Sequence, residues 1–429
     1  MNTSPLTPQR STGKHSSPLS MQPILSHATI KATPNEQACY VMLEISPSKD
    51  LPTSRLPLNL CLVLDKSTSM QGIRLQQVKE ATRQIIDFLE PEDTLSLVVF
   101  SDKAEVLLPG QKNVDKALAK SVASTIQPSG GTEMLQGLLA GLQEIQTNRS
   151  EMSVNHIILL TDGRTYGDDE ECIKQAEWAG LNQISLSTMG IGADWNEDLL
   201  EKMADVSGGT STYIDTPRRI VESFKATVRE LSTIVAREVS LAIELADNVT
   251  LHEAFQIAPH IRRLDINDDH KLALGPLGTN NRKIIILELR ISNTEPGKQQ
   301  LMRLNVMGDV PTQMLNRQAG NWTDITVNVS SDTDTEVVIP PVIITALGKL
   351  AIYKMQEKAM QDMASGNIIA ATQRLETMAT RLLNLGETEL ARAALLEAGR
   401  LARTGSLSSE GRKKIRYGTR SLSILPKEL

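Results

Sequence analysis

Aromatic residues, cysteines and long apolar runs are all scarce in this chain of 429 residues. Aromatic side chains make up 3% of the sequence, and the formal net charge is −6 at pH 7. Sites for single-stranded nucleic acids need aromatic stacking platforms, and phosphate-binding surfaces usually show a basic excess. We therefore expect no nucleic-acid partner.

The three cysteines, Cys39, Cys61 and Cys172, lack the paired spacing of zinc ligands or of a disulfide framework. We expect each to be a small buried side chain. No window approaches 18 apolar residues, so we expect no membrane span. The first residues lack the apolar segment of a secretory signal peptide, which predicts a cytoplasmic protein.

Residues 57–236 have the clearest pattern in the chain, and the length of the chain predicts two or three domains. Short, continuously apolar runs such as LNLCLVLD alternate there with amphipathic helical patterns. Strands buried on both faces of a parallel sheet have this character. The pattern predicts an α/β domain with a doubly wound, mostly parallel sheet and helices on both faces.

Residues 237–341 change to runs in which polar and apolar residues alternate, which predicts an antiparallel β-sandwich. Residues 23–56 carry similar strand patterns and are expected to join this β domain. The α/β domain would then be an insertion between strands of the β domain. Residues 1–22 are rich in Ser, Thr and Pro and are expected to form a disordered tail.

The spacing of apolar residues in 342–405 predicts three amphipathic helices, the last two of which would form an antiparallel hairpin. The hairpin resembles one tetratricopeptide-type unit, but a solenoid needs several units, so ordinary bundle packing is the favoured explanation. Residues 406–429 are expected to form a basic tail that contains the cluster GRKKIRYGTR. This cluster is either a solvated charge run or a contact for an anionic partner.

Oxygen-bearing side chains follow the apolar runs of the α/β domain. Asp65, Ser67 and Ser69 form a D-x-S-x-S motif at the end of the first run. Thr132 lies in an S-G-G-T loop, and Asp162 lies in T-D-G at the end of another run. Ligands of open α/β sheets bind at the carboxyl ends of the strands, and hard oxygen donors suit Mg²⁺. A different explanation is that the two serines cap the helix that begins near Gly72.

The three motifs, in this order, resemble the metal-ion-dependent adhesion site of von Willebrand factor A domains. The resemblance implies that Asp65, Ser67, Ser69, Thr132 and Asp162 hold Mg²⁺, or Mn²⁺ or Ca²⁺, directly or through water. It also implies a coordination position that an Asp or Glu of a protein partner would complete. Residues 189–200 and 207–210 are similar to bacterial and calcium-activated-channel-like members. The β domain with its trailing helices resembles the inter-α-trypsin-inhibitor heavy-chain arrangement.

These observations predict a metal-dependent adaptor or assembly protein and not an enzyme. The sequence has neither a G-x-x-x-x-G-K-[ST] phosphate-binding loop nor a G-x-S-x-G nucleophile motif. One alternative is a cofactor that recruits clients to a AAA+ ATPase. Another is an extracellular adhesion or channel-associated protein, although the missing signal peptide and disulfides count against it.

Overall fold

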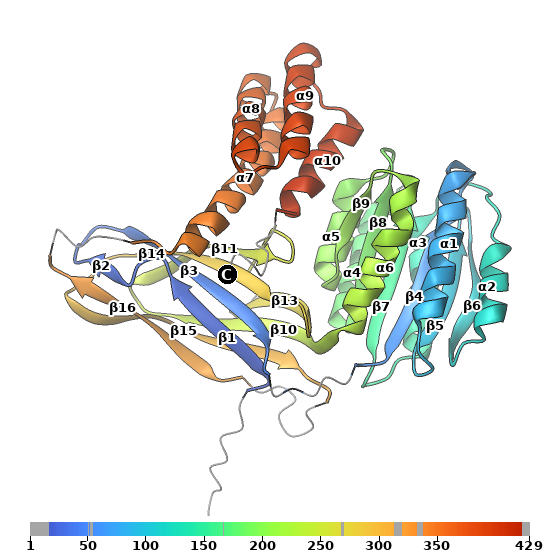
Figure 1. The fold of residues 1–429 in the computed structure, drawn as a ribbon, viewed down its shortest axis with the longest axis horizontal. Helices are drawn as coiled ribbons and strands as arrows, with labels where there is room; N and C mark the ends of the chain where they lie inside the picture. The colour runs from blue at the N-terminus through green and yellow to red at the C-terminus, as the bar shows by residue number, and fades with distance from the viewer. Residues whose placement is uncertain are drawn as a thin grey trace, which may run out of the picture.

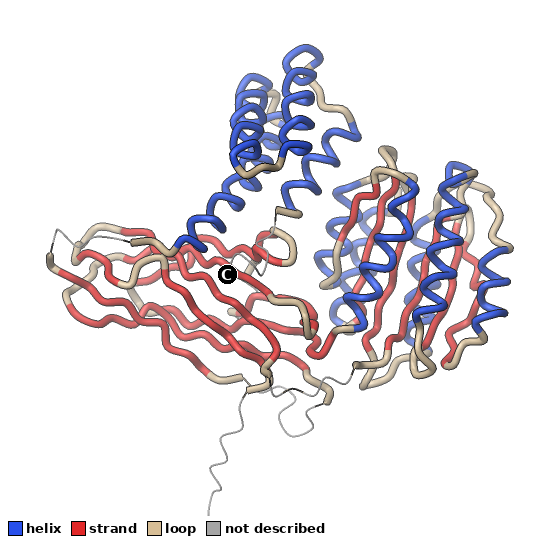
Figure 2. The backbone as a smooth tube through the Cα atoms, in the orientation of Figure 1, coloured by secondary structure: helices blue, strands red, loops and turns tan. Residues whose placement is uncertain are grey.

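The computed structural model describes residues 17–49, 51, 55–165, 167–266, 270–312, 320–332 and 338–422. The chain forms three units, which are an α/β domain, a domain of two β-sheets (the two-sheet domain) and a helical domain (Figure 1). Figure 2 shows helices on both sides of the α/β strands, whereas the C-terminal helices gather beside the two-sheet domain.

The α/β domain contains a six-stranded sheet in the order β6-β5-β4-β7-β8-β9. All neighbours are parallel except β5 and β6. Every residue of β4, β5 and β7 is buried, as expected for strands covered on both faces. The strands are β4 (Leu58–Asp65), β5 (Thr94–Phe100), β6 (Ala104–Lys112), β7 (Val154–Thr161), β8 (Ile184–Ile191) and β9 (Ser211–Ile214).

Alternate residues of β4 point to two separate cores. Leu60 and Leu62 pack with α1 (Ile73–Phe88), α2 (Lys116–Ser124) and α6 (Ile220–Ser232). Cys61 and Val63 pack with helices on the other face, namely α3 (Met134–Thr147), α4 (Asp169–Leu181) and α5 (Glu197–Ser207). Two short 3₁₀ helices, η1 (Thr68–Met70) and η2 (Pro217–Arg219), complete the domain. The predicted doubly wound α/β fold is therefore confirmed.

The two-sheet domain contains two five-stranded sheets around one apolar core. One sheet has the order β1-β3-β14-β11-β12, and its strands are β1 (Leu19–Leu25), β3 (Gln37–Pro47), β14 (Lys283–Ile291), β11 (Val249–Ala258) and β12 (Arg262–Arg263). The other has the order β13-β10-β15-β16-β2, and its strands are β13 (Lys271–Gly278), β10 (Ile234–Leu245), β15 (Gly297–Asp309), β16 (Trp322–Ser330) and β2 (Thr29–Lys31). All pairs are antiparallel except β16 and β2.

The α/β domain is inserted between β3 and β10. β3 pairs along its length with β14, so strands from both sides of the insertion build one sheet. Arg237 of β10 ties the two domains together, because it donates hydrogen bonds to the carbonyls of Ser153 (2.7 Å) and Glu151 (2.9 Å). Asp309 provides the counter-charge for Arg237 within the two-sheet domain.

The helical domain consists of α7 (Pro341–Ala364), α8 (Ile368–Asn384), α9 (Thr388–Thr404) and α10 (Ser409–Arg420). Residues of all four helices share one apolar core with Ile284 and Ile286 of β14. The neighbouring Ile285 and Leu287 point into the core between the two sheets. β14 is thus buried on both faces, and the helices form a bundle against a sheet.

The structure corrects several sequence-based boundaries. Residues 19–22 of the expected disordered tail belong to β1, and residues 1–16 lie outside the described residues. The α/β domain, expected to extend to residue 236, ends with α6 at Ser232, and β10 of the two-sheet domain begins at Ile234. Strands β6 and β9 were not predicted, because each is short or polar and lies at an edge of the sheet.

The expected basic tail is also corrected. Residues 409–420 form α10, whose basic side chains face α5 of the α/β domain, and residues 423–429 lie outside the described residues. Arg412, Lys413, Arg416 and Arg420 pair with acidic residues of the same chain, and Lys414 is exposed, so most of the cluster is not a solvated tail. Among the described residues, no helix is both long and apolar enough to cross a membrane.

Candidate metal centre

Asp65 is the last residue of β4 and is completely buried at the carboxyl edge of the parallel sheet. Its Oδ1 accepts a hydrogen bond from the backbone N–H of Ser67 (2.7 Å). Its Oδ2 accepts one from the hydroxyl of Thr161 (2.6 Å), the last residue of the adjacent strand β7. Two neighbouring strands therefore hold this carboxylate in one orientation.

The other residues of the D-x-S-x-S motif lie beside Asp65. The hydroxyl oxygens of Ser67 and Ser69 are 3.0 Å apart, and Ser69 donates a hydrogen bond to Oδ1 of Asp162 (2.6 Å). Ser67 precedes η1 without making a side-chain cap, and Gly72 occupies the N-cap position of α1. The explanation of the serines as helix caps is therefore wrong.

Thr132 comes from the loop that precedes α3, and four backbone hydrogen bonds anchor this loop. They join Ser129 to Lys66, Thr68 to Gly130, Gly131 to the carboxylate of Asp102, and Glu133 to Ser101. Thr132 is 8% exposed and lies against Gly163, since a methyl group on Gly163 would be 3.0 Å from its hydroxyl oxygen. The structure thus brings all five predicted residues to one place.

The charge at this place is negative and poorly solvated. Burial raises the pKa of Asp65 to about 6, hydrogen bonds from Ser67 and Thr161 oppose the rise, and the negative charge of Asp162 adds to it. A bound cation would relieve this unfavourable charge. Two buried carboxylates and three hydroxyls form a set of hard oxygen donors, so the residues present fit Mg²⁺ or Mn²⁺.

The hydroxyls are essential to this assignment. Within the described part of the chain, no group of three or more His, Cys, Asp or Glu residues could hold a metal ion by itself. A site here depends on Ser67, Ser69 and Thr132 in addition to the two aspartates.

Sequence reasoning missed Arg74, which lies in the first turn of α1. Its guanidinium forms an ion pair with Asp162 and donates a hydrogen bond to the carbonyl of Ser69 (3.3 Å). It also lies close to Gly192 at the end of β8. A basic residue soon after D-x-S-x-S was the only available signal, and it does not identify the carboxylate that the residue contacts.

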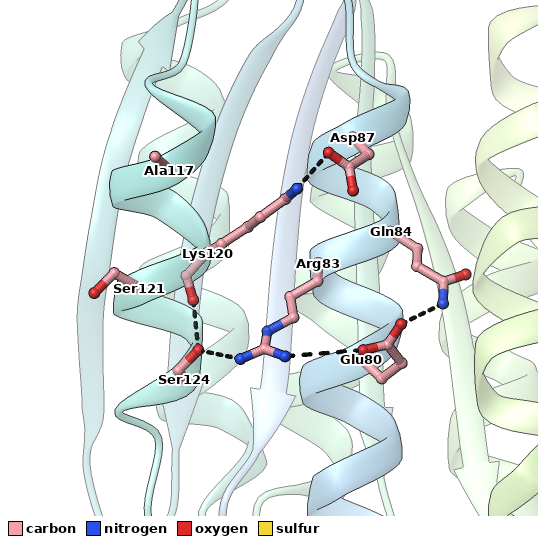
Figure 3. Close-up of a pocket in the computed structure, with 8 residues that line it drawn as sticks. All are labelled: Glu80, Arg83, Gln84, Asp87, Ala117, Lys120, Ser121 and Ser124. Carbon is pink, nitrogen blue, oxygen red and sulfur yellow. Dashed lines mark hydrogen bonds and ion pairs between the residues drawn. The ribbon is translucent and has the colours of Figure 1, made fainter.

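A separate polar groove lies between α1 and α2 (Figure 3). Its charged groups neutralise one another: Lys120 pairs with Asp87, and Arg83 contacts Glu80 (4.0 Å) and the hydroxyl of Ser124 (2.8 Å). The groove offers no excess charge to a ligand.

Two family models match this chain. Residues 59–227 match the von Willebrand factor type A domain, and residues 341–424 match the Sll0103-like, C-terminal alpha-helical domain. Among curated relatives, the uncharacterized protein sll0103 of Synechocystis sp. is 28% identical over 402 residues, which cover 92% of this chain and 94% of that protein. Bovine inter-alpha-trypsin inhibitor heavy chain H4 is 34% identical over 221 residues, which cover 47% of this chain but 24% of that protein.

Solved structures share the fold over nearly the whole chain. The von Willebrand factor type A protein from Catenulispora acidiphila has a TM-score of 0.75 at 18% identity, over 95% of this chain and 98% of that one. The ArnB paralog VWA2 from Sulfolobus acidocaldarius has a TM-score of 0.56 at 14% identity, over 95% and 100%. The family match, the parallel sheet and the arrangement of the site at its carboxyl edge agree. This chain is a von Willebrand factor type A domain protein in which the domain is inserted into a two-sheet domain and followed by an Sll0103-like helical domain.

Proposed function

We propose that this protein is a binding protein, and not an enzyme, that captures an acidic side chain of a protein partner at a divalent-metal site. A von Willebrand factor type A domain supports a protein-interaction role in general. The observation that carries the finer proposal is the convergence of Asp65, Ser67, Ser69, Thr132 and Asp162 at one edge of the sheet.

Asp65, Ser67 and Ser69 would hold the ion from the β4 side, and Thr132 and Asp162 would hold it from the opposite loops. When bound, the ion supplies a positive charge that attracts a partner's carboxylate. The backbone N–H of Ser67 and the hydroxyl of Thr161 fix the orientation of Asp65, so the carboxylate is already in place before binding. The buried surroundings of the two aspartates strengthen any such charge–charge attraction.

The first experiment measures metal binding directly. The EDTA-treated full chain would be titrated with Mg²⁺ and Mn²⁺ by isothermal titration calorimetry. We expect one ion per chain, and we expect Asp65→Asn and Thr132→Val to weaken binding at least about ten-fold, the range seen when support of a metal ligand is removed. Asp65→Asn should fold, because burial already disfavours the charged form of this side chain. Asp87→Asn in the α1–α2 groove is the matched control and should bind like the wild type.

The second experiment tests partner capture. Wild type, Asp65→Asn and Asp87→Asn would be used as bait in lysate of the source cells, with Mg²⁺ or with EDTA. A partner retained by wild type and Asp87→Asn only in Mg²⁺ supports the proposal. Identical partners in every lane, or a chain that binds no metal, would overturn it. In the first of these cases the two-sheet or helical domain would be the interaction surface.

A further inference from the structure

A cavity of about 200 Å³ lies where the three domains meet. The α/β domain contributes β9 with the preceding loop, including Tyr213. The two-sheet domain contributes Arg262 and Lys283, and α10 contributes Tyr417 and Arg420. Figure 1 shows α10 reaching toward β9 from the helical domain, and Tyr417 donates to or accepts from Ser211 of β9 at 2.9 Å. The cavity exists only because all three domains are packed together.

The cavity contains two basic side chains, Lys283 and Arg262, that form no ion pair within the described residues. Lys283 is 7% exposed, and its ammonium donates a hydrogen bond to the carbonyl of Leu274 (2.5 Å). Arg262 donates hydrogen bonds to the carbonyl of Ala273 (3.2 Å) and to Gln256 (3.5 Å). Among the residues that the structure describes, no carboxylate lies within ion-pair distance of either side chain. A buried cation that lacks a partner is costly.

Two acidic residues, Asp205 and Glu230, also line the cavity, but neither forms an ion pair with Lys283 or Arg262 in the described part of the chain. Glu201 pairs with Arg420 (2.9 Å) and with Arg416 (2.5 Å). Glu230 at the end of α6 accepts a hydrogen bond from Asn281 (2.9 Å), and Asp205 at the end of α5 acts on Arg262 only through longer-range attraction. Arg420 repels Arg262, and Arg262 repels Lys283, so the positive charges oppose one another inside the cavity.

The cavity also affects the protonation of Lys283. Burial mainly, and then Arg262, lowers the pKa of Lys283 to about 7, with Glu230 opposing the change. The ammonium form of this lysine therefore lacks stabilisation that a negative ligand would supply.

We propose that this cavity binds a small oxyanion, a phosphate or carboxylate group, held by Lys283 and Arg262. Charge-assisted hydrogen bonds from ammonium and guanidinium groups to such oxygens are short and strong. A cavity of about 200 Å³ is smaller than the ~300–1,000 Å³ of typical sites for larger organic ligands, which limits the ligand to a small ion or acid. Because the cavity is built by three domains, the ligand would also stabilise their packed arrangement.

The test uses the full chain in EDTA, so that it is independent of the proposed metal site. Inorganic phosphate and succinate would be titrated by calorimetry at pH 6.5, with chloride keeping the ionic strength constant. We expect binding of at least one anion, and we expect Lys283→Met and Arg262→Gln to weaken it at least ten-fold. Lys120→Gln, which removes a basic group of the α1–α2 groove, should leave binding unchanged. A response to phosphate alone identifies a phosphate site, and a response to succinate alone identifies a carboxylate site.

Protonation provides a second readout. Binding should strengthen as the pH falls below about 7, where Lys283 is charged. The charged or titratable groups that face this cavity are Arg262 from β12, His260 from the preceding loop, Arg420 from α10, Asp205 from α5 and Glu230 from α6. Lys283→Met should remove most of the pH dependence, and an unchanged melting temperature without anion would show that the variant is folded. Absence of binding to both anions, or equal binding by all variants, overturns the proposal.

Discussion

Arg74 forms an ion pair with Asp162, so a basic side chain of α1 contacts one of the two carboxylates of the candidate metal centre. Its guanidinium also donates a hydrogen bond to the carbonyl of Ser69. The same contacts bring Arg74 beside Gly192, at the carboxyl end of β8. In the metal-free protein, Arg74 thus partly neutralises the charge that would hold an ion.

Replacing Arg74 with Gln should tighten Mg²⁺ binding. Arg74 is 32% exposed, so its pair with Asp162 contributes at most about 1 kcal/mol, which corresponds to an increase in affinity of about five-fold. Calorimetric titration of the EDTA-treated protein measures this change. Arg83→Gln on the same helix is the control, because its contacts lie in the α1–α2 groove. Weaker binding by Arg74→Gln would mean that Arg74 supports the site instead of competing with the ion.

Replacing Gly130 with Ala should disturb the loop that carries Thr132. Gly130 has φ +71°, and an added methyl group would lie 2.3 Å from a carboxylate oxygen of Asp102. We expect a loss of about 1–3 kcal/mol in the free energy of unfolding together with weaker metal binding. Urea denaturation and calorimetry measure the two effects.

The matched control for Gly130→Ala is Gly348→Ala. Gly348 lies inside α7, and a methyl group there would contact nothing within 4 Å. This change should stabilise the protein by about 0.4–1 kcal/mol, because alanine favours the helix. Equal effects of the two changes on metal binding would contradict a specific role for the Gly130 turn.

Replacing Lys413 with Met should destabilise the contact between α10 and the α/β domain. Lys413 is fully buried, and its ammonium lies 3.1 Å from Glu197 and 2.8 Å from the carbonyl of Ala193. Removing one partner of a buried ion pair typically costs about 3–5 kcal/mol, and the second pair of Glu197, with Arg412, should keep the loss near the lower end. Chemical denaturation measures the loss.

Two further variants make the Lys413 result interpretable. The double variant Lys413→Met/Glu197→Leu should recover part of the stability, since it removes the buried carboxylate that has lost one of its two partners, and Arg412 is partly exposed and can be solvated. Arg303→Gln, at an exposed pair with Glu244, should cost less than about 1 kcal/mol. If Lys413→Met lowers the free energy of unfolding by less than Arg303→Gln does, the buried contact that Lys413 makes from α10 does not stabilise the folded chain.

The stability of the protein should rise with pH above about 7. The pKa of Lys283 is lowered by burial in the folded protein, whereas an unfolded lysine keeps a pKa of about 10.4. Between these values the unfolded chain binds more protons, so the free energy of unfolding increases with pH, by up to about 1.4 kcal/mol per pH unit. Melting temperatures at pH 7, 8.5 and 9.5 would show the increase.

Lys283→Met should flatten this part of the pH profile. Lys120→Met, which changes an exposed lysine, should leave the profile as in wild type. A wild-type stability that falls over this range would mean that Lys283 stays protonated in the folded protein. Lys283→Met also serves the anion-binding test, so the two measurements check one another.

The fold and the candidate site could be predicted because both depend on local patterns. Continuous apolar runs such as residues 58–65 are typical of strands in a covered parallel sheet. Such strands end at one edge, so residues that follow them, here Asp65 and Asp162, are brought together by the topology alone. The prediction of the D-x-S-x-S residues as neighbours of Asp162 needed no information about side-chain packing.

The role of α10 could not be predicted in this way. Its strongly basic composition suggested a solvated tail, because a charge pattern does not reveal where the opposite charges lie. The partners of Lys413 and Arg416 are about 215 residues earlier in the chain. Similarly, the alternating pattern within residues 237–341 predicted a sandwich but did not reveal that the C-terminal helices cover the second face of β14.

The sequence by itself determined the α/β fold, the insertion of this domain between strands of a β domain, and the five candidate ligands. These follow from periodicity and from motifs at strand ends. Only the tertiary structure decided that Arg74 neutralises Asp162, that α10 docks on α5, and that Lys283 and Arg262 share a cavity. Each of these contacts joins different secondary-structure elements, and their approach depends on the tertiary packing. Local patterns describe the apolar face of an element, whereas the identity of the surface that covers it is set by the packing of the whole chain.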